Sequence, residues 1–258
     1  MYSDLALLIG GEWRKKGDAG RSEPVINPAD GKVLAELPHA STRDLDDAVA
    51  AAKEGMRIWQ KMSAYDRAQI MHRAADLFRA RIELIAKIIV QEQGKVLNEA
   101  RIESAMAADV IDWYAEEGRR AYGRIVPGRS AHIRQMVVHE PVGIVAAFTP
   151  WNFPVVTPAR KIAGALGAGC AIIIKASEET PGACVEMVRC FIEAGLPAGV
   201  LNLVFGVPSD VSENLLARPE IRKISFTGSV GVGKHLAQMA AKTMKRSAHL
   251  ILGMACHD

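Results

Sequence analysis

The chain has 258 residues, 49% hydrophobic and 24% charged, which is enough to bury a large core and excludes a disordered protein. Its 32 basic and 29 acidic residues give a net charge of +3 and are spread along the chain, which argues against a dedicated nucleic-acid surface. No stretch approaches the roughly 18 apolar residues of a membrane span, no secretory signal is visible at the N-terminus, and four cysteines without C-x-x-C spacing favour a reducing cytoplasm.

The first part of the chain is predicted to be a short extended segment, Leu5–Trp13, followed by helices. Ser41-Thr-Arg-Asp44 resembles a capping box and predicts the start of a first helix. A second helix is predicted from about Ser63 to Gly94, and a third over residues 98–117. The apolar residues at helical spacing are expected in the core: Leu45, Ala48, Ala52 and Met56, then Ile70, Ala74, Leu77, Phe78, Ile85 and Ile88, then Ile102, Met106, Val110 and Trp113.

Residues 123–140 differ from the helical region before them. Pro127-Gly128 indicates a turn, and Ile133–Val138 is β-prone but flanked by polar residues. These features predict a protruding two-stranded β-ribbon. Because an isolated hairpin is marginally stable, we expect a partner for it. That partner is either another subunit or a different part of the same chain.

From Gly143 onward the sequence alternates between buried strands and helices. Strands are predicted at Ile144–Phe148, Ala171–Lys175, Leu201–Phe205 and Ile224–Thr227, with helices at about 155–168, 181–194 and 210–217 and a last one from His235 to Met244. This order predicts an α/β fold with a parallel Rossmann-like sheet and flanking helices. The glycines at 164, 167 and 169 end a helix instead of opening one, so they are interpreted as a helix stop.

Polar or turn-forming residues follow each predicted strand. They are Thr149-Pro-Trp-Asn152, Lys175-Ala-Ser-Glu178, Gly206-Val-Pro208 and Thr227-Gly-Ser229. Since ligands bind at the carboxyl ends of parallel strands, these segments are predicted to converge on one site. The carboxylate of Glu178 can accept both hydroxyls of a ribose, supported by Lys175. The alternative is an exposed loop ion pair without function.

The segment Lys223–Lys234 combines a strand, a glycine turn and a helix start, an arrangement that binds phosphate. Gly228 to Lys234 nearly matches a nucleoside-triphosphate P-loop, but His235 stands where a Ser or Thr is needed for magnesium. The neighbouring strand ends favour the pyrophosphate of a dinucleotide instead. No spacing suggests a metal site, and Cys256-His257-Asp258 are too close in sequence to form a nucleophile set.

Three motifs, in this order, resemble the aldehyde dehydrogenase superfamily: Phe148-Thr-Pro-Trp-Asn-Phe-Pro154, Lys175-Ala-Ser-Glu-Glu-Thr-Pro181 and Phe226-Thr-Gly-Ser-Val-Gly-Val-Gly233. Ile9-Gly-Gly-Glu-Trp13, Asn27-Pro-Ala-Asp-Gly31 and Glu92-Gln-Gly-Lys95 match as well, so the resemblance extends to about Lys245-Arg246. Through Trp113-Tyr-Ala-Glu-Glu-Gly118 and Tyr122-Gly, the chain is most similar to the succinate-semialdehyde dehydrogenase branch.

The resemblance implies an oxidoreductase that converts a semialdehyde, such as succinate semialdehyde, to the acid with NAD(P). It implies that Asn152 donates its amide to the oxyanion and that Arg160 grips the substrate carboxylate. NAD is expected because the Glu178 carboxylate hinders a 2′-phosphate, while Ser177 keeps NADP as the alternative. The implied cofactor-binding residues are Thr149, Pro150, Trp151, Asn152, Lys175, Ser177, Glu178, Gly228, Ser229 and Gly233.

The resemblance also implies a division of the chain. Residues 1–122 and 141–258 are expected to form the cofactor-binding domain without its fifth strand, and 123–140 a hairpin that joins subunits of a homo-oligomeric parent. After Lys245-Arg246 the family's Glu-Leu-Gly-Gly general base and its later cysteine nucleophile have no counterpart. The catalytic domain is therefore expected to be absent and the chain inactive alone. The alternative is a non-catalytic dinucleotide-binding or interaction module that can self-associate.

Overall fold

The computed structural model describes residues 2–251, so the prediction about Cys256-His257-Asp258 lies outside the described residues. The strands are β1 (Leu7–Ile9), β2 (Glu12–Arg14), β3 (Ser22–Ile26), β4 (Val33–Pro38), β5 (Arg124–Pro127), β6 (Arg134–Val137), β7 (Ile144–Phe148), β8 (Ile172–Lys175), β9 (Leu201–Val204), β10 (Ile221–Gly228) and β11 (Arg246–Ile251). The helices are α1 (Thr42–Trp59), α2 (Ala64–Ala80), α3 (Ile82–Gln93), α4 (Leu97–Arg119), α5 (Val156–Gly167), α6 (Pro181–Glu193), α7 (Pro208–Ala217) and α8 (Val230–Lys242).

The central sheet has seven strands in the order β11-β10-β7-β8-β9-β1-β2. Five of them, β11, β10, β7, β8 and β9, pair in parallel, which confirms the Rossmann-like prediction for this part. The opening segment adds β1 and β2 as antiparallel edge strands, so the sheet is mixed.

The prediction that the fifth parallel strand is missing is wrong. β11 runs beside β10, with Arg246 opposite Lys223 and Ser247 opposite Ile224. The hydrogen bonds between paired strands join main-chain groups. A strand can therefore form here although the Glu-Leu-Gly-Gly motif of the family has no counterpart.

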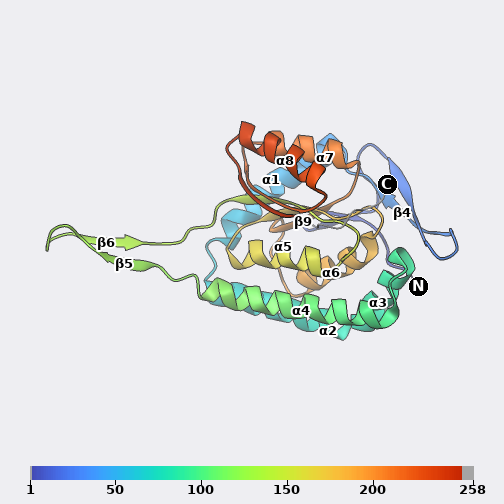
Figure 1. Cartoon of the computed structure of the whole chain (residues 1–258), viewed down its shortest axis with the longest axis horizontal. Coiled ribbons are helices and arrows are strands. Elements are labelled where there is room, and N and C mark those ends of the chain that lie inside the picture. The colour runs from blue at the N-terminus through green and yellow to red at the C-terminus, as the bar shows by residue number, and fades with distance from the viewer. Residues whose placement is uncertain (1, 252–258) are drawn as a thin grey trace.

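Helices cover both faces of the sheet (Figure 1). Helices α5 and α6, which follow β7 and β8, lie on one face, and α1, α7 and α8 lie on the other. Helices α2, α3 and α4 form a further layer that packs on α5 and α6. Because both faces are covered, β7, β8 and β9 are buried along their whole length, as their continuous apolar runs predict.

The N-terminal helices begin where the sequence predicts. Ser41 caps α1 in a complete capping box with Asp44, and Gly94 ends α3 in the left-handed conformation at φ 76°. The single helix predicted from Ser63 to Gly94 is wrong, because the chain leaves helical geometry at Arg81 (φ −108°, ψ 8°) and forms α2 and α3. Neither glycine nor proline marks this break.

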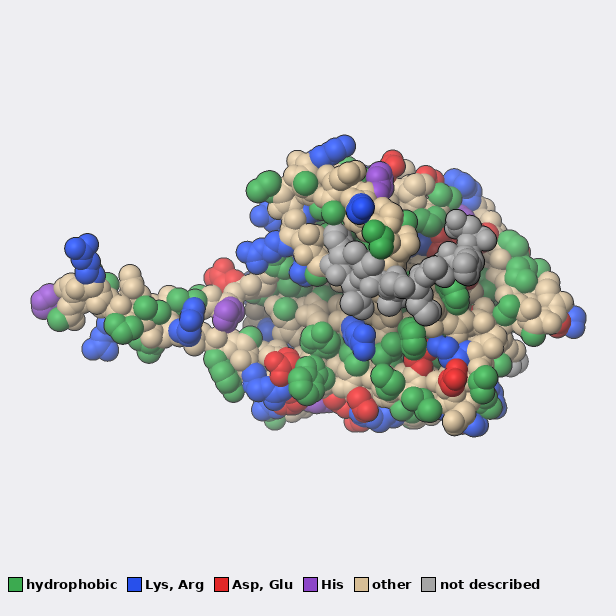
Figure 2. Space-filling model, viewed as in Figure 1, with side chains coloured by type: hydrophobic (Ala, Val, Ile, Leu, Met, Phe, Trp, Pro, Cys, Tyr) green, Lys and Arg blue, Asp and Glu red, His purple; other side chains and the backbone are tan. Residues whose placement is uncertain are grey.

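The face of α4 that was predicted to be buried is turned outward. Ile102, Met106 and Trp113 are 53%, 46% and 64% exposed, and Val110 is half-buried. The residues that face the core are small or polar, with one isoleucine: Ala100, Glu103, Ser104, Ala107, Ala108, Ile111 and Ala115. Small residues allow α4 to approach α5 closely, since a Cβ at Gly118 would lie 2.6 Å from the carbonyl oxygen of Gly167. Hydrophobic side chains are consequently visible over this layer of the surface (Figure 2).

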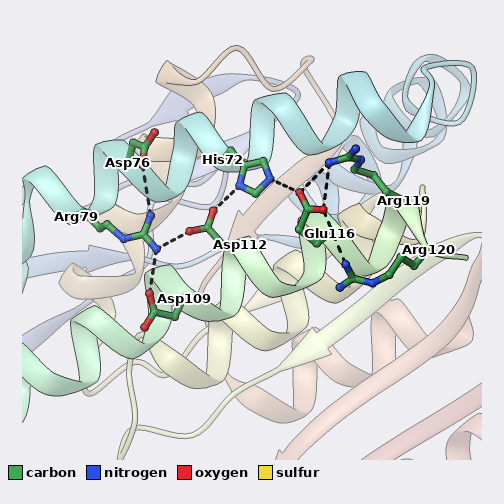
Figure 3. Close-up of polar contacts among 8 residues, drawn as sticks. All are labelled: His72, Asp76, Arg79, Asp109, Asp112, Glu116, Arg119 and Arg120. Carbon is green, nitrogen blue, oxygen red and sulfur yellow. Dashed lines mark hydrogen bonds and ion pairs between the residues drawn. The ribbon is translucent and has the colours of Figure 1, made fainter.

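An ionic network joins α2 to α4 on the outer surface (Figure 3). His72 of α2 lies between two carboxylates of α4, with Nδ1 2.6 Å from Asp112 Oδ1 and Nε2 2.8 Å from Glu116 Oε1. Arg79 extends the network to Asp76, Asp109 and Asp112. The network binds the outermost helices together without contributing to the apolar core.

The β5–β6 hairpin projects from the body of the molecule (Figure 1), which confirms the predicted protruding ribbon. Every residue of both strands is exposed. The interpretation in which the chain itself covers this hairpin is therefore wrong for the described residues. Exposed apolar side chains, among them Ile125 and Met136 at 80% and 77%, are available to a partner.

A second hairpin, β3–β4, was not predicted. Its strands carry mixed polar and apolar residues, and only Val25, Leu37 and Pro38 are buried. The turn between them is closed by the amide of Gly31, which donates to the carbonyl of Asn27 at 2.8 Å. With so few buried positions, the strands have too weak an alternating pattern to be recognised.

Candidate functional site

A cavity of about 490 Å³ opens at the carboxyl ends of β7, β8 and β10. The helix after β7 lies on one face of the sheet and the helix after β10 on the other, so the cavity occupies the point where the winding reverses. The predicted residues that line it are Thr149, Pro150, Trp151, Lys175, Ser177, Glu178, Gly228 and Ser229. The convergence expected from the strand ends is thus present in the structure.

Lys175 and Glu178 form an ion pair in the wall of this cavity. Nζ of Lys175 donates to Oε2 of Glu178, and the side chains are only 7% and 16% exposed. The interpretation as an exposed loop pair is therefore wrong. The carbonyl of Lys175 also accepts the amide of Thr149 at 3.3 Å, which joins the two loops at the sheet edge.

The N-terminus of α8 forms another part of the wall. Ser229 is the N-cap and accepts the amide of Val232, and both Gly231 and Val232 line the cavity. The unpaired amides and positive dipole end of a helix start suit a phosphate. Only Ser229 separates β10 from α8, which leaves no loop long enough to wrap a triphosphate and supports the rejection of a P-loop.

Gly233 does not line the cavity, although it was predicted to bind the cofactor. It is buried one turn into α8, where a Cβ would lie 3.3 Å from the ring of Phe226. Gly228 has the same neighbour, because a Cβ there would lie 2.5 Å from that ring. A larger residue at either position would press against the Phe226 ring, so the two glycines allow α8 to start close to β10.

Two buried polar atoms near the cavity lack hydrogen-bond partners among residues 2–248, whose side chains the structure describes. They are Oγ1 of Thr149 and Oδ1 of Asn152. Thr149 lines the cavity, whereas Asn152 is half-buried in the following loop, beside the lining residue Trp151. A buried polar atom without a partner is unfavourable unless a ligand supplies one. With the Lys175–Glu178 pair and the α8 N-terminus, these atoms fit the hydroxyl, amide and phosphate groups of a dinucleotide.

The sequence did not identify the far wall of the cavity. It is made by residues of α7 and α8: Pro208, Ser209, Ser212, His235 and Leu236. The sequence signal available for this wall was Gly206-Val-Pro208, which was recognised as the end of a strand. The contribution of α8 could not be read from the sequence, because it depends on how α7 and α8 pack against each other.

Arg160 lies in a different cavity, of about 380 Å³, and no lining residue is common to the two. Lys161, Lys223 and Arg246 line this second cavity as well, and Glu140 is its one carboxylate. Nζ of Lys161 donates to Ser225 Oγ at 3.2 Å. Burial, with a smaller effect of Arg160, lowers the pKa of Lys161 to about 8. The second cavity is therefore positively charged and suited to an anion.

The described cysteines do not provide a reactive thiolate. Cys170, Cys184 and Cys190 are buried and free, and burial raises the pKa of each thiol, that of Cys190 to about 12. Among residues 2–248, whose side chains the structure describes, no group of three or more His, Cys, Asp or Glu could hold a metal ion. No helix in this part of the chain is long and apolar enough to cross a membrane.

Comparison with known proteins gives a consistent result. The chain is 49% identical to 4-(hydroxymethyl)benzenesulfonate dehydrogenase TsaD1 of Comamonas testosteroni, over 95% of this chain and 51% of the relative. It is 38% identical to the succinate-semialdehyde dehydrogenase [NADP(+)] GabD of Escherichia coli K12, over 93% of this chain and 49% of the relative. The chain thus spans about half the length of these relatives.

The fold comparison agrees with the sequence comparison. An aldehyde dehydrogenase from Brucella melitensis biovar abortus superposes with a TM-score of 0.95 at 38% identity, over 97% of this chain and 52% of that one. The family model for the Aldehyde dehydrogenase family matches residues 13–254. The chain belongs to the aldehyde dehydrogenase family.

Proposed function

We propose that this chain is the cofactor-binding part of an oxidoreductase that oxidises an aldehyde with an anionic group, such as succinate semialdehyde, to the acid. Members of the family use NAD or NADP, and the bound nicotinamide would accept the hydride. The observation that carries the proposal is the cavity at the winding reversal, lined by the largely buried Lys175–Glu178 pair and by the α8 N-terminus.

Each part of the cavity has a proposed role. Glu178 and Lys175 hold the adenosine ribose, because a carboxylate accepts the two hydroxyls of a diol. Gly228, Ser229 and the first turn of α8 that follows them face the pyrophosphate. Pro150 and Trp151 line the nicotinamide end, next to the Asn152 amide that would donate to the oxyanion.

NAD is the proposed cofactor. A 2′-phosphate on the adenosine ribose would meet the carboxylate of Glu178, which is part-buried in the cavity wall and repels a second negative charge. Lys175 does not compensate fully, because its ammonium is already held by Glu178. The Escherichia coli relative is named for NADP(+), so the chain's own residues, and not the family, decide this preference.

The anionic character of the proposed substrate rests on the second cavity. This cavity is lined by four basic residues and one acidic residue, which are Arg160, Lys161, Lys223, Arg246 and Glu140. The names of both relatives given above describe compounds with an anionic group, a sulfonate or a carboxylate. We propose that Arg160 contributes to binding this group in the whole enzyme, since its planar guanidinium pairs with either anion.

We propose that the chain binds the cofactor but does not oxidise aldehydes alone. Aldehyde oxidation of this type needs a thiolate nucleophile, and burial keeps the thiols of Cys170, Cys184 and Cys190 protonated. The test is to add NAD and succinate semialdehyde to the purified chain and to follow NADH and the melting temperature. NAD should raise the melting temperature without NADH formation. Steady NADH formation would show that the chain is active.

A second candidate is a non-catalytic dinucleotide-binding module that interacts through its surface. The outward apolar residues of α4 and the exposed β5–β6 hairpin favour it. Light scattering distinguishes this candidate. A chain that remains monomeric at all concentrations, and whose melting temperature does not respond to NAD, contradicts it.

A further inference from the structure

We propose that Gln93, Lys95 and Glu103 form a positioning clamp, and that this clamp sets the direction of the Asn152 side chain. Gln93 ends α3, Lys95 lies in the connection to α4, and Glu103 lies within α4; all three contact the loop that joins β7 to α5 or its junction with α5. The inference rests on the proposed function, because Asn152 has a role only if a cofactor and an aldehyde meet beside it.

Glu103 caps helix α5 from a distant part of the sequence. The N-cap residue of α5, Val155, makes no side-chain cap of its own. Instead, Oε1 of Glu103 accepts the amides of Val155 and Val156 at 3.0 and 3.2 Å, and Glu103 is only 3% exposed. A carboxylate at a helix N-terminus is favoured by the dipole and satisfies amides that have no partner within the helix. Glu103 therefore fixes the point at which the loop becomes helix.

Lys95 connects this cap to Asn152. Its Nζ donates to Oε2 of Glu103 at 2.6 Å and to the carbonyl oxygen of Asn152 at 2.9 Å. The same ammonium lies 4.4 Å from the centre of the Phe153 ring. The positive charge balances the buried carboxylate, and both side chains are nearly buried, so solvent screens these contacts little.

Gln93 completes the clamp from the other end of the loop. Its Nε2 donates to the carbonyls of Trp151 and Asn152 at 3.1 and 2.6 Å. The intervening residue, Gly94, adopts φ 76°, a turn that glycine makes without strain and that brings Gln93 and Lys95 to the same carbonyl. The main chain on both sides of the Asn152 side chain is thereby fixed.

Apolar packing holds the loop at its α5 end, where Pro154 and Val155 are buried, but not around Asn152 itself. Its aromatic residues, Trp151 and Phe153, are 45% and 44% exposed. The side-chain oxygen of Asn152 has no hydrogen-bond partner in the described part of the chain. With no partner for its side-chain oxygen and an exposed aromatic residue on each side, the Asn152 side chain takes its direction from its main chain. That main chain depends on the clamp.

The test compares the native chain with Glu103→Gln and Lys95→Met. Glu186→Gln is the matched control, because Glu186 is also a buried carboxylate, bonded to Ser3 Oγ at 2.6 Å and away from the cavity lining. Calorimetry gives the affinity for NAD and for ADP-ribose, which lacks only the nicotinamide. Hydrogen exchange of the peptide spanning residues 149–157 reports the amides of Val155 and Val156 directly.

Both clamp variants should lose about tenfold in NAD affinity while ADP-ribose affinity changes by less than about twofold. Exchange of the loop peptide should be at least about tenfold faster in Glu103→Gln, and unchanged in the control. Equal losses for NAD and ADP-ribose, equal affinities of the native chain for the two compounds, or unchanged exchange would each overturn the clamp. If the native chain binds neither compound, the proposed function is wrong, and the exchange comparison still decides whether the clamp holds the loop.

Discussion

Nδ1 of His72 lies 2.6 Å from Oδ1 of Asp112, and this contact joins α2 to α4 (Figure 3). Burial opposes a charge on the imidazole, but hydrogen bonds and charges from Asp112 and Glu116 outweigh it and raise the pKa of His72 above 6.5. Because the folded-state pKa is the higher one, the stabilisation is fully present below about pH 6.5 and is lost as the pH rises through the folded-state pKa.

The pH dependence is measured with His72→Gln. Melting temperatures of the variant and the native chain should differ most near pH 6, and the difference should shrink as the pH rises to about 8.5. His132→Gln, in the exposed turn of the hairpin, serves as control. A difference between His72→Gln and the native chain that stays constant over this range contradicts the assignment.

The turn between β10 and α8 gives a prediction about stability. In Gly228→Ala the new Cβ meets the ring of Phe226 at 2.5 Å, so the variant should lose about 1–3 kcal/mol of unfolding free energy. Gly231→Ala is the matched comparison, because a Cβ there meets nothing within 4 Å and removes a glycine from a helix. That variant should be unchanged or up to about 1 kcal/mol more stable. Urea denaturation measures both, and equal effects would contradict the packing argument.

Cofactor preference should respond to Glu178→Ser. The substitution removes the carboxylate that repels a 2′-phosphate and releases the ammonium of Lys175, so the ratio of NADP to NAD affinity should rise about tenfold or more. Glu179→Ser is the neighbouring comparison, since Glu179 also lines the cavity but is bonded to Ser177 and not to Lys175. Calorimetric titrations with both nucleotides decide it. An unchanged ratio in Glu178→Ser shows that another group selects the cofactor.

The hairpin should mediate self-association. Ile125 and Met136 pair across β5 and β6 and are both largely exposed, so they present an apolar edge that a second copy can cover. Replacing both by serine should reduce the assembly size seen by light scattering without changing the melting temperature of the monomer. Native and substituted chains of identical size would exclude this hairpin as the contact.

Several elements of the fold could be predicted because their signals are local. The buried strands, the capping box at Ser41 and the helix stop at Gly94 each depend on a few consecutive residues. The site residues Thr149, Lys175 and Glu178 could also be predicted, because parallel strands bring their carboxyl ends to one edge.

What the sequence could not show depends on contacts between distant residues. The outward face of α4 carries Ile102 and Trp113, and spacing alone favoured burying them. The inner face of α4 carries mostly small residues because α5 approaches it closely at Gly167. The Glu92-Gln-Gly-Lys95 stretch was singled out only because it resembles the aldehyde dehydrogenase family. The structure supplies its physical reason, since Glu92 caps α6 at Gly182 and Ala183 while Gln93 and Lys95 hold the Asn152 loop.

We propose that the cavity at the carboxyl ends of β7, β8 and β10 binds a dinucleotide. Calorimetric titration of NAD into the native chain and into Lys175→Met tests it most directly. We predict one NAD site per chain, displacement of NAD by ADP-ribose, and about tenfold weaker binding in the variant. No detectable NAD binding to the native chain, or binding that Lys175→Met leaves unchanged, would contradict it.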